Sequence, residues 1–286
     1  MKTPKISVIM PTYNGEKYIK EAIESVLFQD EADFEFIIIN DCSSDNTPQI
    51  INEYAKKDER IKVISNEGNL KLPKSLNKGF SIAKGEYLTW TSDDNIFKQK
   101  AFSYMSHFLD RNKEIDLISC SMDYIDQNGE FLFSTQNDKN RKGTYWLAGA
   151  NNVGACFMYR KSIANLIGDY NPDYFLAEDY DYWARIAIYG QIYYSPENFY
   201  KYRSHPKSLT ATKKATIKEK MALVQQKYSE IILNRANISN AKKAYMYYQM
   251  YKNCHRKDYL YSALRLDLIK SSYRLLWFML KGKEYT

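Results

Sequence analysis

Two adjacent aspartates, Asp93 and Asp94, are the residues of this chain with the clearest capacity for chemistry. They follow Gly85–Trp90, an aromatic and β-branched segment that predicts a short strand. Two carboxylates side by side at the end of a buried strand repel each other, and Mg²⁺ or Mn²⁺ relieves that repulsion while bridging to phosphate. The pair therefore predicts a clamp for a metal and a nucleotide diphosphate. A solvated turn with an Asx cap is the competing interpretation.

Two more polar residues follow other predicted strands. Tyr13 comes shortly after the strand predicted at 6–10, and Asp41 comes shortly after the strand predicted at 36–39. In open α/β sheets, ligands bind outside the carboxyl ends of the strands. We therefore expect Tyr13, Asp41 and the aspartate pair to meet at one edge of a sheet.

The spacing of the elements predicts the scaffold for these residues. Helices at 16–29, 47–57 and 73–83 separate strands at 6–10, 36–39, 61–64 and 85–90. This alternation predicts an α/β fold with a parallel sheet and helices on both faces. No GxGxxG follows the first strand, so a dinucleotide-binding Rossmann site is not expected. We expect Glu178 and Asp179 at the start of a helix, where the helix dipole favours carboxylates. We also expect closing strands at 191–194 and 199–202, and helices throughout 211–286.

Cysteine spacing and hydropathy exclude several classes of protein. The four cysteines are scattered and form no CxxC pair, which argues against a disulfide framework or a structural zinc site and fits a reducing compartment. The first five residues lead directly into an apolar strand, without the regions of a signal peptide. The longest apolar run, at 275–280, is far shorter than the roughly 20 residues that span a bilayer. We therefore expect a cytoplasmic protein.

Positive charge is concentrated at the C-terminal end of the chain. The net charge is +7, and residues 211–286 hold 16 Lys and Arg against 5 Asp and Glu. Such a tail suggests membrane lipid or nucleic acid as a partner. Residues 271–281 are apolar and flanked by cations, like interfacial helices at anionic bilayers, which predicts a peripheral position at the inner face of the cell membrane. A helix packed on the rest of the chain or on a second subunit is the alternative. No nucleic-acid module accompanies the charge, so we expect no nucleic-acid partner.

Taken in order, these motifs resemble family 2 glycosyltransferases. The residues that carry the resemblance are Val8–Asn14, Asn40-Asp41 with its serine-rich loop, Ser92–Asp94 and Glu178-Asp179. The resemblance covers about residues 4–205. It implies a GT-A fold, with a Rossmann-like, mostly parallel central sheet flanked by helices, and an inverting reaction with a nucleotide-sugar donor. It also implies a GT-A catalytic domain at 1–210, followed by a basic helical extension at 211–286.

The resemblance implies a nucleotide-binding role for several residues. In the family, the residue that matches Tyr13 packs on the nucleobase, and those that match Pro11 and Thr12 shape that pocket. An aromatic face suits a flat base. In the family, the aspartate at the position of Asp41 accepts a hydrogen bond from N3–H of uracil. An ionised carboxylate suits this role, since it accepts hydrogen bonds and cannot donate them. Lys71 matches a basic residue near the nucleotide. A surface tyrosine, a loop cap and a solvated lysine are the respective alternatives.

The resemblance also implies the metal and catalytic residues. Asp93 matches the residue that contacts the ribose and the metal, and Asp94 matches the direct ligand of Mn²⁺ or Mg²⁺. His205 matches a late histidine that completes the metal shell, with a loop histidine as the alternative. Asp179 matches the catalytic base, which takes the proton of the acceptor hydroxyl. Glu178 is the nearest rival for that role.

The implied function is transfer of a sugar from a UDP-sugar to a hydroxyl of a glycan or lipid-linked glycan. The expected products are bacterial surface glycans such as capsule, lipopolysaccharide or teichoic acid. The QxxRW sequence of processive synthases is absent, so we expect one sugar per encounter. A catalytically silent nucleotide-sugar-binding scaffold is the alternative. A nucleotidyltransferase is least favoured, because no glycine-rich basic loop lies near the N-terminus.

Overall fold

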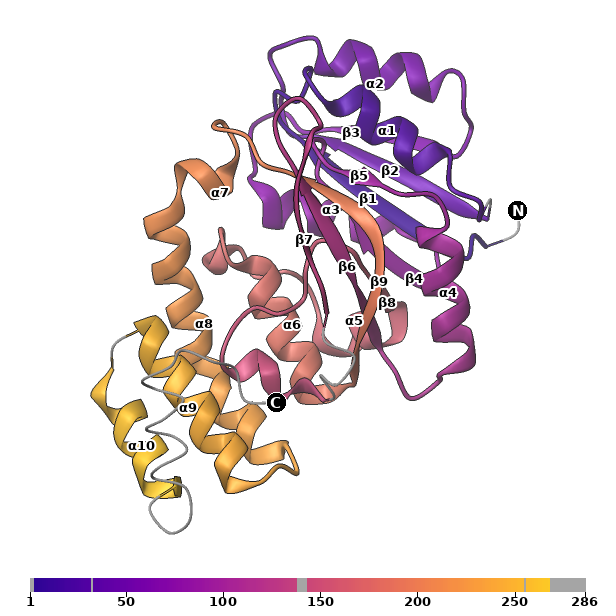
Figure 1. Cartoon of the computed structure of the whole chain (residues 1–286). Helices are drawn as coiled ribbons and strands as arrows, with labels where there is room; N and C mark the ends of the chain where they lie inside the picture. The colour runs from indigo at the N-terminus through magenta and orange to yellow at the C-terminus, as the bar shows by residue number, and fades with distance from the viewer. Residues whose placement is uncertain (1–2, 32, 138–142, 255, 268–286) are drawn as a thin grey trace.

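The computed structural model describes residues 3–31, 33–137, 143–254 and 256–267 (Figure 1). The strands in this part of the chain are β1 (Ile6–Thr12), β2 (Phe34–Asn40), β3 (Ile61–Ser65), β4 (Tyr87–Trp90), β5 (Ile96–Phe97), β6 (Leu117–Ile125), β7 (Phe131–Thr135), β8 (Phe157–Arg160) and β9 (Ile192–Arg203). The helices are α1 (Ile19–Leu27), α2 (Thr47–Ala55), α3 (Leu72–Ile82), α4 (Ala101–Arg111), η1 (Thr144–Ala148), α5 (Lys161–Ile167), η2 (Pro172–Tyr174), α6 (Glu178–Tyr189), α7 (Leu209–Thr212), α8 (Lys214–Arg235), α9 (Asn240–Cys254) and α10 (Lys257–Asp267).

The strands form one sheet in the order β3-β2-β1-β4-β8-β6-β9-β5, and β7 pairs with β6. Strands β1 to β4 are parallel to one another, as their alternation with helices predicted. The other half is mixed, because β8 is antiparallel to both β4 and β6 while β9 is parallel to β6. The predicted α/β class and central sheet are confirmed.

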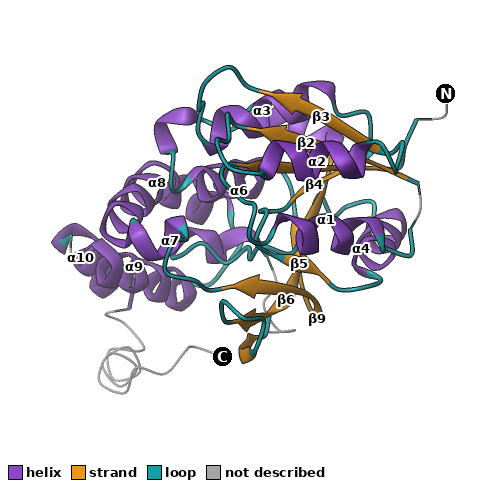
Figure 2. Ribbon diagram, turned by 90° about the horizontal axis from the view of Figure 1, so that it is seen from above, coloured by secondary structure: helices purple, strands orange, loops and turns teal. Residues whose placement is uncertain are grey.

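Helices cover both faces of the sheet, and each face has its own apolar core (Figure 2). Alternate residues of β1 belong to different cores. Val8 shares one core with buried residues of α1, α2 and α4, and Ile9 shares the other with buried residues of α3 and α6. This explains why the first two strands are apolar without alternation, as expected for strands buried on both faces. The two layers fix the strand ends from which the candidate site is built.

Two element boundaries differ from the sequence prediction. The first strand does not stop at Pro11 but continues to Thr12, paired with β2. Its pairing with β4 ends at Ile9 and Trp90, so the missing N–H of Pro11 removes no bond from that ladder. The closing strands predicted at 191–194 and 199–202 are one strand, β9. Its register shifts where Ser195 and Asn198 face consecutive residues of β6, which accommodates Pro196 in a bulge.

The C-terminal segment is helical up to residue 267, as predicted, and α8 packs against α6 and η1 (Figure 1). Buried residues of α8, among them Val224, Tyr228 and Ile232, share an apolar cluster with Trp183 of α6. None of the helices in the described part is long and apolar enough to span a bilayer. The predicted interfacial helix at 271–281 lies outside the described residues. The division at residue 210 stays a prediction.

Candidate active site

Asp93 and Asp94 lie just beyond the end of β4, at the carboxyl edge of the parallel strands. Thr12, the last residue of β1, donates its hydroxyl hydrogen bond to Oδ2 of Asp93. Gly15 allows this approach, because a Cβ atom at that position would overlap the Asp93 carboxylate and the Thr12 hydroxyl. The end of β1 and the turn after it therefore lie beside the aspartate pair. The sequence predicted this proximity, because both segments follow the carboxyl ends of strands.

The second aspartate is paired with a distant histidine. Nε2 of His205 lies 3.0 Å from Oδ2 of Asp94. The other oxygen, Oδ1, is buried and has no hydrogen-bond partner among the described residues. Burial raises the pKa of Asp94, and the bond from His205 opposes that rise. Burial and the neighbouring charge of Asp94 raise the pKa of Asp93 to about 7. A carboxylate beside an imidazole is a pair of ligand types that suits a divalent cation.

A buried arginine braces this aspartate pair. Arg203 is 2% exposed, and its Nε donates to the backbone carbonyl of Asp94 at 2.9 Å. Its Nη2 pairs with Oε2 of Glu21 at 2.5 Å, and its guanidinium lies 4.6 Å from the ring centroid of Tyr18. The same tyrosine ring lies 5.2 Å from the His205 ring. Arg203 and Tyr18 thus fix both the aspartate loop and the histidine.

Asp41 is buried beyond β2 and bound by three donors. Its Oδ1 accepts from Leu70 N and Asn66 Nδ2, both at 2.8 Å, and its Oδ2 accepts from Lys71 N at 3.0 Å. Lys78 donates in turn to Oδ1 of Asn66 at 2.7 Å. Asp41 therefore caps the loop that leads into α3, as the alternative interpretation expected. Each carboxylate oxygen has more than one lone pair, so a nucleobase role remains compatible with this cap.

The remaining predicted nucleotide residues differ in exposure. Pro11 and Thr12 are buried in β1, whereas the Tyr13 side chain is 52% exposed at the strand end. Lys71 is exposed; its backbone N–H contacts Asp41, and its φ of 69° is left-handed. Asn14 and Cys42, which follow β1 and β2, also have positive φ angles. Strained backbone gathered at one edge of a sheet is typical of a binding site.

Glu178 and Asp179 begin α6, as predicted. Glu178 is 5% exposed, and its Oε2 accepts from the N–H of Leu176, whose φ of 79° is left-handed. Burial and the charge of Asp179 raise the pKa of Glu178 to about 8. Burial also raises the pKa of Asp179, but an N–H of Asn151 donates to its Oδ2 at 2.9 Å and opposes that rise. Burial thus favours the neutral form of both carboxyls, and the hydrogen bond from Asn151 favours the charged form of Asp179.

Tyr202 on β9, just before Arg203, is half-buried. Burial raises the pKa of its hydroxyl, and the negative charges of Asp94 and Asp179 raise it further. The hydroxyl lies 3.0 Å from Oγ1 of Thr210.

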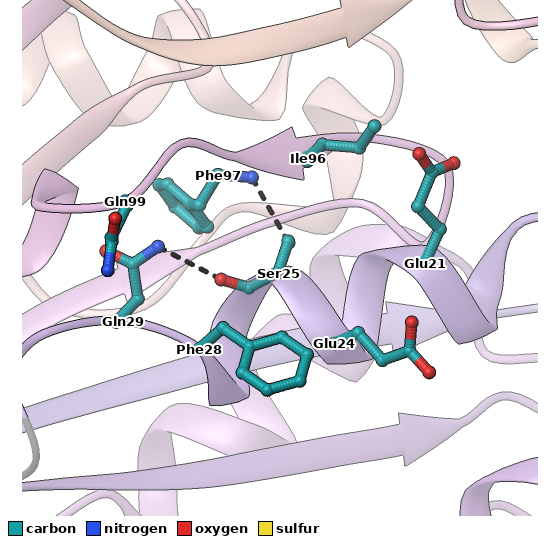
Figure 3. Close-up of a pocket in the computed structure, with 8 residues that line it drawn as sticks. All are labelled: Glu21, Glu24, Ser25, Phe28, Gln29, Ile96, Phe97 and Gln99. Atoms are coloured by element: carbon teal, nitrogen blue, oxygen red, sulfur yellow. Dashed lines mark hydrogen bonds between the residues drawn. The ribbon is translucent and has the colours of Figure 1, made fainter.

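A cavity of about 510 Å³ lies behind this site, between α1 and residues 96–99 (Figure 3). Its wall includes Phe28, Ser25 and Gln29, with Ser25 Oγ accepting from the backbone N–H of Phe97 at 3.1 Å. Its two acidic residues are already bonded, Glu21 to Arg203 and Glu24 to Tyr54. None of the predicted site residues lines it.

The sequence model for "Glycosyl transferase family 2" matches residues 7–168, more than half of the chain. The chain belongs to glycosyl transferase family 2. An uncharacterised glycosyltransferase of Methanocaldococcus jannaschii is 35% identical over 190 residues, which are 65% of each chain. The present chain thus spans somewhat less than two thirds of that family member.

Two solved structures share the fold of this family 2 chain. S. aureus TarS 1–349, in complex with UDP-GlcNAc, has a TM-score of 0.65 and 21% identity, covering 98% of this chain and 76% of the other. The mannosyltransferase PcManGT from Pyrobaculum calidifontis, in complex with GDP-Man and Mn²⁺, has a TM-score of 0.65 and 15% identity, covering 99% and 80%. At these identities the likeness shows the fold alone.

The family match ends before two predicted site residues, Asp179 and His205, and their roles stay predictions. Sequence reasoning missed Asn66 and Lys78 beside Asp41, and Asn151 beside Asp179. No local pattern marks these amides and this lysine. Each is recognisable only once the fold places it beside a carboxylate or its partner.

Proposed function

We propose that this family 2 member is an inverting, metal-dependent glycosyltransferase that moves a sugar from a UDP-sugar to an acceptor hydroxyl. The observation that carries the proposal is the pairing of Asp94 with His205, which leaves one buried carboxylate oxygen of Asp94 without a partner in the described part of the chain. The UDP-GlcNAc complex of a structural neighbour supports a UDP-sugar donor, although another neighbour binds GDP-Man.

The side chains at the candidate metal site fit a divalent cation. Asp94 and His205 would hold Mn²⁺ or Mg²⁺, with Asp93 beside them. Among the described residues no group of three or more His, Cys, Asp or Glu side chains is arranged to hold a metal ion, so the protein would supply only these two side chains as ligands. The open positions suit diphosphate oxygens, because such ions usually bridge one or two carboxylates to phosphate. The bound cation would supply charge neutralisation to the leaving diphosphate.

The protein's own groups would carry the remaining steps. Tyr13 offers a face to the uracil ring, and Asp41 accepts from its N3 proton. Asp179 accepts the proton of the acceptor hydroxyl while that oxygen attacks C1 from the face opposite UDP. The C1–oxygen bond to the acceptor forms as the bond to UDP breaks, which inverts the configuration at C1. The hydrogen bond that Asn151 donates to Asp179 favours the charged form of this carboxylate and supports it as the base.

The acceptor and the place of reaction belong to the same proposal. A bacterial surface glycan of capsule, lipopolysaccharide or teichoic-acid type is carried over from the sequence resemblance, as is a lipid-linked acceptor. A lipid-linked acceptor would place the reaction at the inner face of the cell membrane, with the basic C-terminal segment toward anionic lipid. The two-part division of the chain at residue 210 remains part of the proposal.

Isothermal calorimetry of UDP, GDP and CDP, with and without Mn²⁺, tests the proposal. We expect Mn²⁺-dependent binding of UDP in the wild type, weakened by roughly 100-fold or more in Asp94→Ala. The exposed Asp169, which follows α5, provides the matched control, and Asp169→Ala should bind UDP like the wild type. Absence of nucleotide binding under every condition would contradict the proposed enzyme. UDP binding without any transfer would favour the scaffold.

A further inference from the structure

Helix α8 holds the chain segment that precedes β8. Nε2 of Gln225 donates to the carbonyl of Gly149, and Oγ of Ser229 donates to the carbonyl of Ala148, both at 2.7 Å. Gln225 and Ser229 are 3% and 1% exposed. Each bond satisfies a carbonyl in a buried setting, where an unmade hydrogen bond is costly. Residues 148–149 are therefore fixed to the C-terminal segment.

Asn151 follows directly and contacts the candidate base. Its Nδ2 lies 2.9 Å from Oδ2 of Asp179, while the other oxygen of Asp179 accepts from the N–H of Tyr180 at 2.7 Å. Asn152 closes the turn by donating to the carbonyls of Trp146 and Ala150 at 2.8 and 3.0 Å. The position of the Asn151 amide is thus set by the turn, and the turn is set by α8.

We propose that residues 148–152 are a positioning device for Asp179, in which Asn151 orients the carboxylate and helix α8 holds Asn151 in place. The inference rests on the proposed role of Asp179 as the base. This arrangement makes the C-terminal segment part of the catalytic apparatus. Helix α8 binds the carbonyl of Gly149, and Asn151, whose amide holds the base, is only two residues further along the chain.

The chemistry of this contact gives it a measurable signature. An N–H donated to a carboxylate stabilises its charged form, and here it opposes burial, which raises the pKa of Asp179. Other ionisable groups also interact electrostatically with this carboxylate: Glu178 and Tyr180 on α6, Tyr170 before η2, and Tyr202 on β9. These groups favour the neutral form of Asp179 or carry no charge at neutral pH, so the Asn151 amide is well placed to keep it ionised.

The first test measures Asp179 directly by ¹³C NMR of protein labelled at the aspartate carboxyl carbons, with the signal assigned by Asp179→Asn. We expect Asn151→Ala to raise the pKa of Asp179 by about one to two pH units. Gln225→Met should raise it in the same direction, and Ser229→Ala provides a milder variant with a smaller change in volume. Gln226→Met is the matched control on the exposed face of α8, and it should leave the pKa unchanged. An unchanged pKa in Asn151→Ala, or equal effects of the two glutamine variants, overturns the inference.

The second test uses UDP release from UDP-GlcNAc in the presence of Mn²⁺, measured against pH. Asn151→Ala should move the acidic limb of the profile to higher pH while UDP affinity, measured by calorimetry, stays that of the wild type. If Asp179→Asn abolishes UDP release but Asn151→Ala leaves both the carboxyl pKa and the acidic limb unchanged, the inference fails and the proposed function stands. If Asp179→Asn releases UDP normally, the base assignment fails and this inference fails with it.

Discussion

His205 Nε2 lies 3.0 Å from Asp94 Oδ2, although 111 residues separate them in the chain. The sheet explains the contact. Strand β5 pairs antiparallel with β9, with Ile96 opposite Lys201, so the residues just before Ile96 lie beside those just after Lys201. The contact therefore depends on the short edge strand, and not on any local sequence pattern.

Removal of this imidazole should weaken metal use. We expect His205→Ala to raise the Mn²⁺ concentration needed for half-maximal UDP binding by about 10–100-fold, because a ligand of the cation is lost. Calorimetric titrations of UDP at a series of Mn²⁺ concentrations measure this requirement. His107→Ala is the matched control, since His107 is exposed on α4. An identical Mn²⁺ requirement in the two variants would show that His205 is not a metal ligand.

Asp179 and Glu178 should respond differently to loss of charge. Asp179→Asn should lower turnover by about 10²–10⁴-fold with little change in UDP affinity, because general base catalysis supplies a factor of that size. Glu178→Gln should keep most turnover at pH 7, because burial and Asp179 already hold Glu178 in its protonated form. UDP release and UDP calorimetry measure the two quantities. Normal turnover in Asp179→Asn would transfer the role of base to another group.

Glu178 should also make stability depend on pH. Its pKa rises from an ordinary 4.5 to about 8 on folding, so between these values the folded state binds more protons than the unfolded state. Its contribution is complete below pH 4.5 and is lost as pH rises toward 8. Relative to Glu178→Gln, the wild type should lose on the order of 2–4 kcal/mol of unfolding free energy between pH 5 and pH 8. Urea unfolding of both proteins across this range checks the slope, and parallel curves would contradict the assignment.

A pair of glycine variants tests the packing around Asp93. In Gly15→Ala the new methyl group would overlap the Asp93 carboxylate and the Thr12 hydroxyl, so one of them must move. We expect UDP affinity in Mn²⁺ to fall at least about tenfold, with cooperative unfolding retained. Gly68→Ala is the control, because a Cβ there meets no atom of the described chain within 4 Å. Equal affinities for the two variants would mean that the position of Asp93 is not important for binding.

The part of the site that depends on local sequence patterns was predicted from the sequence. Tyr13, Asp41 and the Asp93–Asp94 pair lie at one edge, because parallel strands separated by helices bring their carboxyl ends together. The helix start at Glu178 followed from its acidic first turn. Strand β9 was predicted as two strands, at 191–194 and 199–202, whereas a bulge that accommodates Pro196 joins them into one.

The other contacts of the site depend on tertiary structure. Asn151 meets Asp179 across 28 residues, and Arg203 meets the backbone of Asp94 across 109. A lone asparagine before a strand and an arginine at the end of one have many possible partners. Their roles follow only from the register of β9 and the packing of α8 on η1, which no single-sequence periodicity contains.

The remote pairing of β5 with β9 sets an order for events during synthesis of the chain. At about 5–20 residues per second, the aspartate pair waits on the order of 6–20 s for the histidine that a ribosome adds 111 residues later. The first strands can pair meanwhile, since β1 to β4 are contiguous in the sheet. In a nascent chain the strands β1 to β4 can therefore be ordered before Asp94 and His205 meet.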